Sequence, residues 1–335
     1  MKQLQIKMGN TISKNNIMGS VKKVQSVFGL IILLIIASFV CVKNGKNLFL
    51  DWRNIMNVLR AVSENGIIAV GMTMVILLGG IDLTVGSVLG LVGTGSAALM
   101  MNNHFGFVPT IIIGLGIGCV YGLFNGVVIT KMKMQPFLVT LASMSMARGI
   151  ARIWSNGAGI PLSYGDGLAP VQFEYLQIRI GGLIPVPAII FVAVAIIFSI
   201  VLNRTKFGRQ IYAIGGNERA AFLAGIRVHR IKIFVFMICA TLSALSGMIH
   251  AAQVSQGGPN DGIGYELNAV AAVCIGGTSL AGGKGTIAGT VIGAVILGLL
   301  DNIMGLNGVN SNLQLIVKGL ILILAVFLQA DKQRD

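Results

Sequence analysis

Apolar stretches long enough to cross a membrane recur along most of this chain of 335 residues. A transmembrane helix needs about 20 predominantly apolar residues. Hydrophobic residues make up 55% of the chain and charged residues 11%, well below the roughly 25% charged residues of soluble domains. The sequence therefore predicts an all-α membrane protein, with little chain left for a separate soluble catalytic domain.

The spacing of the apolar stretches predicts about ten transmembrane helices, which place both termini in the cytoplasm. We predict a cytoplasmic tail at 1–27, a transmembrane domain at 28–330 and a second cytoplasmic tail at 331–335. Residues 44–63 are predicted to lie along the membrane interface, and 155–184 and 254–265 to form outside loops. The predicted spans are about 27–43, 64–79, 83–101, 107–130, 136–154, 185–203, 231–253, 266–280, 285–303 and 313–330.

The net charge of +14 lies mostly in the N-terminal tail and in loops. The tendency of cytoplasmic loops to carry Lys and Arg explains this excess more simply than nucleic-acid binding does. The basic residues of the 44–63 connector do not follow this charge rule, because the predicted topology puts them on the outer side of the membrane. The apolar run at 28–42 is followed by no small-residue cleavage site, so we predict an uncleaved first span.

Residues 204–230 form a basic island between two apolar spans, with six Lys and Arg residues against one acid, Glu218. Its middle predicts a short helix. Asn217 is a good N-cap residue, Ala220 to Ala224 favour a helix, and Gly225 is a typical stop. A short capped helix at the cytoplasmic surface is a feature that a partner protein can bind.

A short glycine motif occurs twice. Gly79-Gly80-Ile81-Asp82-Leu83-Thr84-Val85-Gly86 and Gly276-Gly277-Thr278-Ser279-Leu280-Ala281-Gly282-Gly283 share the pattern Gly-Gly-x-x-Leu-x-x-Gly. Both follow a predicted span that runs inward, which indicates a parallel internal repeat. Paired glycine breaks at corresponding positions point to a transport path; chance similarity between glycine-rich segments is the alternative.

Glycines spaced four residues apart mark two helix faces for close packing. They are Gly114, Gly118, Gly122 and Gly126 in one predicted span, and Gly285, Gly289 and Gly293 in another. Small residues at this spacing let a second helix approach its backbone.

No group of residues indicates an enzyme. The histidines are far apart in sequence, and the four cysteines are scattered, with no metal-ligand spacing, so we predict no metal site. The segment Gly282-Gly283-Lys284-Gly285-Thr286 departs from the phosphate-binding loop pattern, so this chain is not expected to bind ATP.

Asp82 is the notable charged residue, since a carboxylate between apolar runs needs a partner or a function. We interpret it first as a cap that accepts N–H bonds from Thr84 or Val85, with a place on the transport path as the alternative. The other path candidates are Asn125, Asn268 and Asn302, which could also join helices by hydrogen bonds.

Arg148 and Arg152, four residues apart, are expected to extend toward the outer interface. A wet outer interface explains His250.

Three stretches together resemble one family. They are 69–87, 213–226 and 272–286, which contain the two glycine motifs and the centre of the basic island. In this order they resemble the permease subunits of bacterial ribose-, xylose- and galactose-type ABC sugar importers. The resemblance runs from about residue 28 to residue 330.

The resemblance implies one half of a homodimer or heterodimer in the bacterial inner membrane, a sugar-binding protein outside, and a separate cytoplasmic ATPase that uses ATP and Mg²⁺. It identifies the helix at 217–225 with the coupling helix that docks on this ATPase. The coupling residues would be Asn217, Glu218, Arg219, Ala220, Ala221 and Gly225. It does not identify the sugar.

A proton- or sodium-coupled secondary transporter is the alternative. It would use Asp82 or Asp301 as its titrating group. Its uptake would survive without an ATPase and collapse with the ion gradient.

Overall fold

The computed structural model describes residues 28–43, 46–165 and 168–330, and the predicted tails lie outside these ranges. The longer helices are Phe28–Val40, α2 (Trp52–Leu77), α3 (Val85–Met101), α4 (Phe107–Lys131), α5 (Pro136–Trp154), α7 (Val186–Arg204), α8 (Lys206–Gly216), α10 (Val228–Val254), α11 (Tyr265–Ile275), α12 (Ile287–Leu306) and α13 (Ser311–Ala330). Two short helices are α6 (Val171–Glu174) and α9 (Glu218–Leu223). Six two-residue strands form three antiparallel pairs: β1 (Val42–Lys43) with β2 (Lys46–Asn47), β3 (Ile160–Pro161) with β6 (Gln256–Gly257), and β4 (Arg179–Ile180) with β5 (Ile184–Pro185).

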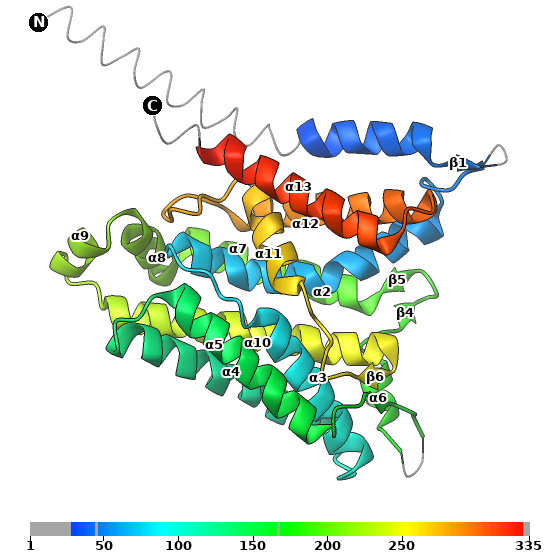
Figure 1. Ribbon diagram of the computed structural model, residues 1–335, viewed down its shortest axis with the longest axis horizontal. Helices are drawn as coiled ribbons and strands as arrows, with labels where there is room; N and C mark the ends of the chain where they lie inside the picture. Colours follow the sequence, from blue (N-terminus) through cyan, green and yellow to red (C-terminus); the bar gives the residue numbers. More distant parts are fainter. Residues whose placement is uncertain (1–27, 44–45, 166–167, 331–335) are drawn as a thin grey trace, which may run out of the picture.

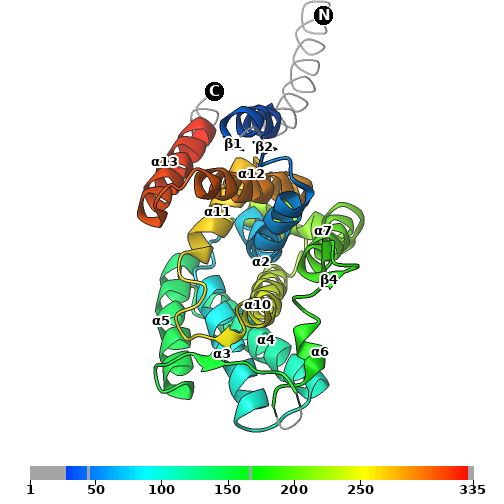
Figure 2. The ribbon, with the colours of Figure 1, turned by 90° about the vertical axis from the view of Figure 1, so that its right-hand side faces the viewer.

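Helices α2 and α10 form the centre of the bundle (Figures 1 and 2). Helix α2 packs against α7, α10, α11 and α12, and α10 packs against α3 and α4. Figure 2 shows α12 and α13 on one side of α2, and α3, α4 and α5 on the other. Helices α8 and α9 lie at one end of the bundle, and the three strand pairs lie toward the other end (Figure 1).

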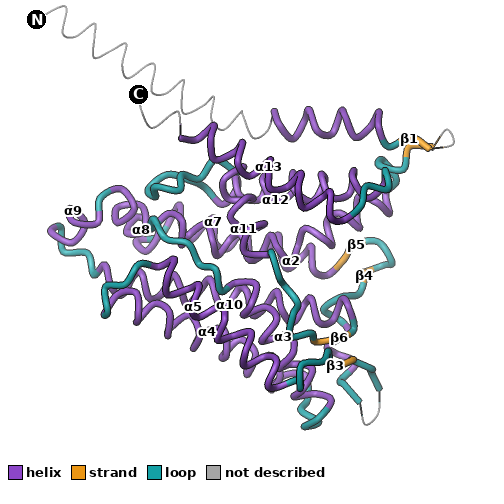
Figure 3. Tube along the Cα trace, viewed as in Figure 1, coloured by secondary structure: helices purple, strands orange, loops and turns teal. Residues whose placement is uncertain are grey.

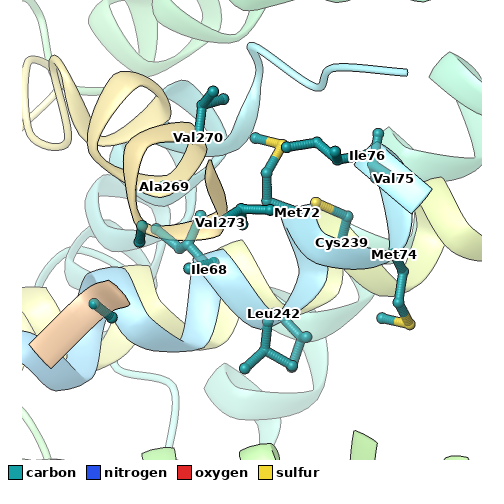
Figure 4. Packing of buried hydrophobic residues seen from close by; sticks show 14 of the residues in the cluster. Ile68, Met72, Met74, Val75, Ile76, Cys239, Leu242, Ala269, Val270 and Val273 are labelled. Carbon is teal, nitrogen blue, oxygen red and sulfur yellow. The ribbon is translucent and has the colours of Figure 1, made fainter. Parts of the chain in front are cut away.

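The main core lies where α2, α10 and α11 meet (Figure 4). Met72 and Ile76 of α2 pack there with Cys239 of α10 and Val273 of α11, and all four side chains are at most 2% exposed. Burial of such a large apolar side chain contributes about 1.5–3 kcal/mol. The central helix α2 is therefore largely shielded from the membrane by other parts of the chain.

Each predicted span contains a helix among the described residues, and α3, α4, α5 and α7 begin and end within two residues of the predicted bounds. Pro136 occupies the first turn of α5, where its missing N–H costs no hydrogen bond. In the described ranges, five helices are long and apolar enough to cross a membrane: α2, α4, α7, α10 and α12. The chain is an integral membrane protein, and the count of ten crossings stays a prediction.

The predicted connector at 44–63 is wrong over its second half. Helix α2 begins at Trp52, after Asp51 accepts a hydrogen bond from the backbone N–H of Arg53. The apolar positions that suggested an interfacial segment are the buried face of the first turns of α2, which includes Met56 and Val58. Polar residues on these turns have partners inside the protein, since Asn54 bonds to Asn302 and Arg60 to Gln253.

The sequence prediction also missed one helix and overextended another. Helix α8 occupies the first half of the basic island, where no helix was predicted. The predicted span at 266–280 contains only the 11 residues of α11, which ends at Ile275 because the following glycines turn the chain.

The glycine spacing in α4 is confirmed as a packing face. A Cβ added to Gly118, Gly122 or Gly126 would fall within 3 Å of α10 atoms. Gly289 and Gly293 likewise bring α12 against Gly276 and Ala272 at the end of α11. Backbone contact at these positions fixes the distance between the paired helices.

Residues 254–265 were predicted as an outside loop, and this is wrong. The segment runs along α3, with Gly257 against Gly93 and Gly262 against Gly86. Gly257, Gly258 and Pro259 are buried. The α3 glycines let this segment approach the α3 backbone closely, so it packs inside the bundle before α11 begins (Figure 3).

Candidate functional site

Helix α9 in the basic island has a defined cap at each end. The Asn217 side chain accepts a hydrogen bond of 2.9 Å from the backbone N–H of Ala220. At the other end Gly225 has a φ of +81°, and the N–H groups of Gly225 and Ile226 bond back to Phe222 and Ala221. This is the Schellman arrangement, which glycine adopts without strain. The predicted short helix and both of its caps are confirmed.

The outer face of α9 is apolar and exposed. Phe222 is 62% exposed and Leu223 77%. A hollow of about 490 Å³ lies beside this face, between α9 and the first turn of α10, and Arg227 and Arg230 contribute to its lining. An exposed apolar patch with a basic rim is typical of a protein–protein contact.

An ion pair fixes α9 to α10. Lys232 lies 2.7 Å from the carboxylate of Glu218 and contacts both of its oxygens. The Glu218 side chain remains 53% exposed, so a partner could also reach it.

Helix α8 connects α9 to the bundle through a glycine junction, which we define as Gly215 of α8, Leu77 at the end of α2, and Gly282 and Gly283 before α12. The N–H of Gly283 donates a 2.9 Å hydrogen bond to the carbonyl of Leu77. A Cβ added to Gly215 would fall 2.5 Å from the Gly283 nitrogen and closer still to the Leu77 oxygen. The three segments therefore meet backbone to backbone.

A side-chain hydrogen bond supports the glycine junction. The Tyr212 hydroxyl of α8 donates a 2.8 Å hydrogen bond to the carbonyl of Gly285. Burial raises the pKa of the Tyr212 phenol, so the hydroxyl keeps the proton that it donates. A displacement of α8 would act directly on the end of α2 and on the segment before α12.

The predicted helix breaks lie at this same end of the bundle. Gly79 ends α2 and Gly277 ends α11, each with a positive φ and each in a Schellman arrangement. The two turns align one residue away from the alignment of the sequence motifs. By its place in the turn Gly79 corresponds to Gly277, whereas the motif pairs Gly79 with Gly276. Gly80 and Gly276 are the neighbouring residues of these two turns, and Gly276 packs on Gly289. This similarity of helix ends extends over a few residues only.

Asp82 and Asn125, two of the predicted path residues, are brought together by Thr84. One oxygen of Asp82 accepts hydrogen bonds from the Thr84 N–H at 2.9 Å and the Thr84 hydroxyl at 2.5 Å. Asn125 donates to the same hydroxyl at 3.3 Å. Asp82 therefore makes the local bond to Thr84 expected of a cap, while its other oxygen is buried without a hydrogen bond.

The other two predicted path residues lie elsewhere. Asn302 of α12 forms a pair of hydrogen bonds with Asn54 of α2, at 2.8 and 3.0 Å. Asn268 is half-buried on α11. The structure thus gives Asn302 a role in joining two helices, which the sequence left as an alternative.

Sequence reasoning missed a polar cluster near the strand-bearing end. Glu64 of α2 lies 2.8 Å from Nδ1 of His250 and 2.9 Å from the Tyr265 hydroxyl. Glu64 is 5% exposed, so the wet interface expected for His250 is wrong. A buried carboxylate needs such partners. No local motif signals the cluster, because its residues are about 190 positions apart in the chain.

Arg148 and Arg152 were expected to extend toward the interface, and for the partly buried Arg148 this is wrong, while Arg152 is exposed in the last turn of α5. Arg148 donates to the carbonyls of Pro259 and Asp261, at 3.0 and 2.5 Å. Arg152 donates to the side chain of Asn260 at 2.9 Å. The two arginines hold the extended segment before α11 against the bundle, where its carbonyls would otherwise lack partners.

Comparisons with known proteins agree with these features. Residues 54–326 match the family described as branched-chain amino acid transport system / permease component. The chain is 43% identical to the ribose import permease protein of Bacillus subtilis (strain 168), over 94% of both chains. It is 36% identical to the L-arabinose transport system permease protein of Escherichia coli (strain K12), over 92% of this chain and 91% of that one.

The xylose transport system permease protein of Haemophilus influenzae is 34% identical, over 90% of this chain and 95% of that one. No solved structure matches the chain. The family match and three relatives above 30% identity over almost the whole chain agree with each other. The chain therefore belongs to the permease-component family of ABC importers that includes these ribose, xylose and L-arabinose permeases.

Proposed function

We propose that this protein is the membrane subunit of an ATP-driven importer that carries a neutral monosaccharide into the cytoplasm, and that ribose is the first sugar to test. Three ribose permeases from different species have 40–43% identity to the chain, compared with 34–36% for the xylose and arabinose permeases. Substrate preference can change between such relatives, so ribose is one member of a panel.

The observation that carries the proposal is the geometry of α9. A short helix with two caps exposes Phe222 and Leu223 at the end of the bundle, and α8 connects it to the end of α2 and the start of α12. A separate ATPase that binds α9 could move these helix ends. If each of the two ATPase states binds the inward-open and outward-open forms of the permease with different affinity, the ATPase cycle shifts the permease between these forms.

In this proposal, α9 is the coupling helix, and the exposed Asn217, Glu218, Arg219, Ala220 and Gly225 form its contact with the ATPase. Ala221, expected from the sequence to share this contact, is 5% exposed and packs inward. ATP and Mg²⁺ bind to that subunit and not to this chain. A second permease copy completes the membrane unit, and an extracytoplasmic protein delivers the sugar. Asp82, with one unpartnered oxygen, is the path candidate that ranks first.

The proposed orientation follows from charge. The end of the bundle with α8 and α9 carries the basic island, so it faces the cytoplasm of a bacterial inner membrane. About ten crossings then place both termini on that side. The two glycine-ended helices, α2 and α11, run toward the same end, as a parallel repeat requires.

Uptake by the purified system tests the function. The permease is reconstituted in liposomes with its partner ATPase and binding protein, and D-ribose, D-xylose and L-arabinose are supplied in turn. We expect uptake of at least one of these sugars to require ATP on the α9 side and to continue when ion gradients are abolished. Uptake that needs no ATPase and collapses with a proton or sodium gradient would favour a secondary transporter instead.

A further inference from the structure

Helix α11 begins inside the bundle rather than at its surface. It has 11 residues, about 16 Å of helix, at 1.5 Å a residue. This is about half of the ~30 Å thickness of a bilayer core. The segment 256–264, a short strand followed by turns, lies beside α3 between Gly93 and Gly86, about 10 Å along that helix, before α11 starts.

A polar hollow of about 340 Å³ lies beside the first turn of α11. It is lined by Met144, Ser145, Arg148 and Arg152 of α5, and by Ile263 and Glu266. Arg148 is 12 residues after Pro136, the first residue of α5, so it lies about 18 Å along that helix. The α5 residues of the hollow therefore extend from the middle of that helix, at Met144, to its last turn, at Arg152.

Lipid is an unsuitable neighbour for this hollow. Three charged side chains line it, and Arg148 is the arginine nearer the middle of α5. A charged side chain facing hydrocarbon near mid-bilayer costs roughly 2.5–3.5 kcal/mol or more. Charged residues at this depth usually face water or other protein. The second permease copy proposed above would cover the opening and keep lipid out.

The chemistry of the lining favours a neutral polyol. Glu266 supplies a carboxylate that accepts hydrogen bonds, and the guanidinium groups of Arg148 and Arg152 supply donors. A hydroxyl group both donates and accepts, so vicinal hydroxyls can bond to both kinds of group. Met144 and Ile263 add apolar walls for the C–H surface of a sugar ring.

Charged substrates fit the hollow less well. An anion would meet Glu266, and a cation would meet two arginines. Arg148 also already donates through Nη1 to two carbonyls, so part of its hydrogen-bonding capacity is committed to holding the segment before α11. A ligand that moves through the site should bind with few strong bonds, as a neutral polyol would.

We propose that this hollow is a membrane-embedded binding site for the hydroxyl groups of the transported sugar. The assignment rests on the proposed sugar import and adds a location and a set of binding residues. Arg152 and Glu266 bind the sugar directly, and Arg148 also positions the N-terminal end of α11.

Cysteine labelling tests whether the hollow is wet and on the sugar's route. Ser145→Cys places a thiol in the hollow, and Ile153→Cys places one on the same helix at a residue that is 80% exposed but outside the hollow. Both variants are assembled with the ATPase and binding protein in liposomes. A charged, membrane-impermeant methanethiosulfonate reagent is added, and modification at each position is followed by mass spectrometry.

The thiol at position 145 should react at least about tenfold faster than that at 153, because only a hydrated thiol forms the reactive thiolate. D-ribose, or the sugar of the panel that is transported, should slow modification at 145. Equal rates at the two positions, or a rate at 145 that the transported sugar leaves unchanged, would overturn the proposal. Uptake measured in the same liposomes reports separately on the proposed function.

Substitution of the binding groups gives a second readout. Glu266→Gln and Arg152→Gln should each reduce sugar protection of the 145 thiol by about threefold or more, as expected for loss of one charge-assisted hydrogen bond. Glu174→Gln on α6, outside the hollow, is the matched control and should leave protection unchanged. Undiminished protection in both hollow variants would show that these side chains do not bind the sugar.

Discussion

Gly215 has no side chain, and its backbone touches two other segments at the glycine junction. A methyl group there would overlap the carbonyl of Leu77 and come within 2.5 Å of the Gly283 nitrogen. Both contacts are backbone atoms, which cannot rotate away as a flexible side chain could. The spacing between α8, the end of α2 and the segment before α12 therefore depends on this one residue.

Gly215→Ala should separate the coupling segment from the bundle. Overpacking of this kind costs about 1–3 kcal/mol, so we expect sugar uptake to fall about tenfold or more, since 1.4 kcal/mol is a factor of ten. Binding of the ATPase should remain, because α9 is unaltered. Uptake and ATPase binding are measured on the same preparation.

The adjacent Gly216 provides the control for this variant. A Cβ at Gly216 meets no atom within 4 Å, so Gly216→Ala should transport normally. Normal uptake in Gly215→Ala as well would mean that the junction does not transmit motion.

Asp82→Asn should be mild if Asp82 acts as a cap. An asparagine oxygen can still accept the hydrogen bonds from Thr84. Asp82→Ala should cost about 1–3 kcal/mol of stability, because the Thr84 N–H would lose its buried partner. Thermal unfolding and uptake are measured for both variants. Loss of uptake in the asparagine variant, at normal membrane levels, would place Asp82 on the transport path.

Glu64→Ala should destabilise the protein strongly. It leaves His250 and Tyr265 without their shared partner in the bundle, and loss of one partner of a buried pair costs about 3–5 kcal/mol. The melting temperature in detergent should fall by several degrees relative to the unaltered protein. Substitution of the half-buried Glu174 of α6 serves as the comparison, and equal melting temperatures would contradict the structural role of Glu64.

Helix α9 is the element on which coupling depends. Six residues form too short a helix to persist alone, so its caps, the ion pair to Lys232 and its packing on α10 hold it in place. The face that carries Phe222 and Leu223 remains exposed. The chain thus presents a fixed helix to the partner, not a flexible loop.

A charge reversal distinguishes two roles of Glu218. Glu218→Lys places two lysines together, so we expect uptake to fall sharply while the protein stays folded. If Glu218 serves only to hold α9 through Lys232, then adding Lys232→Glu should restore uptake. If the partner ATPase also contacts Glu218, the double variant should remain inactive. Normal uptake in the single variant would contradict the assignment of Glu218 to coupling.

Elements defined by local residue patterns could be predicted from the sequence. Asn217 and Gly225 specify α9 through backbone hydrogen bonds to near neighbours, and the α4 glycines specify a packing face. Features that depend on distant contacts could not be predicted. The burial of 257–259 follows from glycines on α3, and the Glu64 cluster joins three segments that only the fold brings together.

The whole molecule connects a surface helix to two helix ends and to an interior polar hollow. Helix α9 is held by α8, and α8 contacts the end of α2 and the segment that leads from α11 into α12. Helix α11 begins beside the hollow with Arg148 and Glu266. These contacts form a continuous physical route between α9 and the hollow. The route acts as a switch if the chain has two discrete arrangements of these contacts.

The most direct test of this account is co-purification of the partner ATPase. The tagged chain is extracted from its own host in mild detergent, in the natural form and with 217–225 replaced by a Gly-Ser linker of equal length. We predict that a soluble ATPase co-purifies with the natural chain and is lost with the linker variant, while the membrane domain stays folded. Recovery of the ATPase with both forms, or with neither, would contradict the assignment of α9 as the coupling helix.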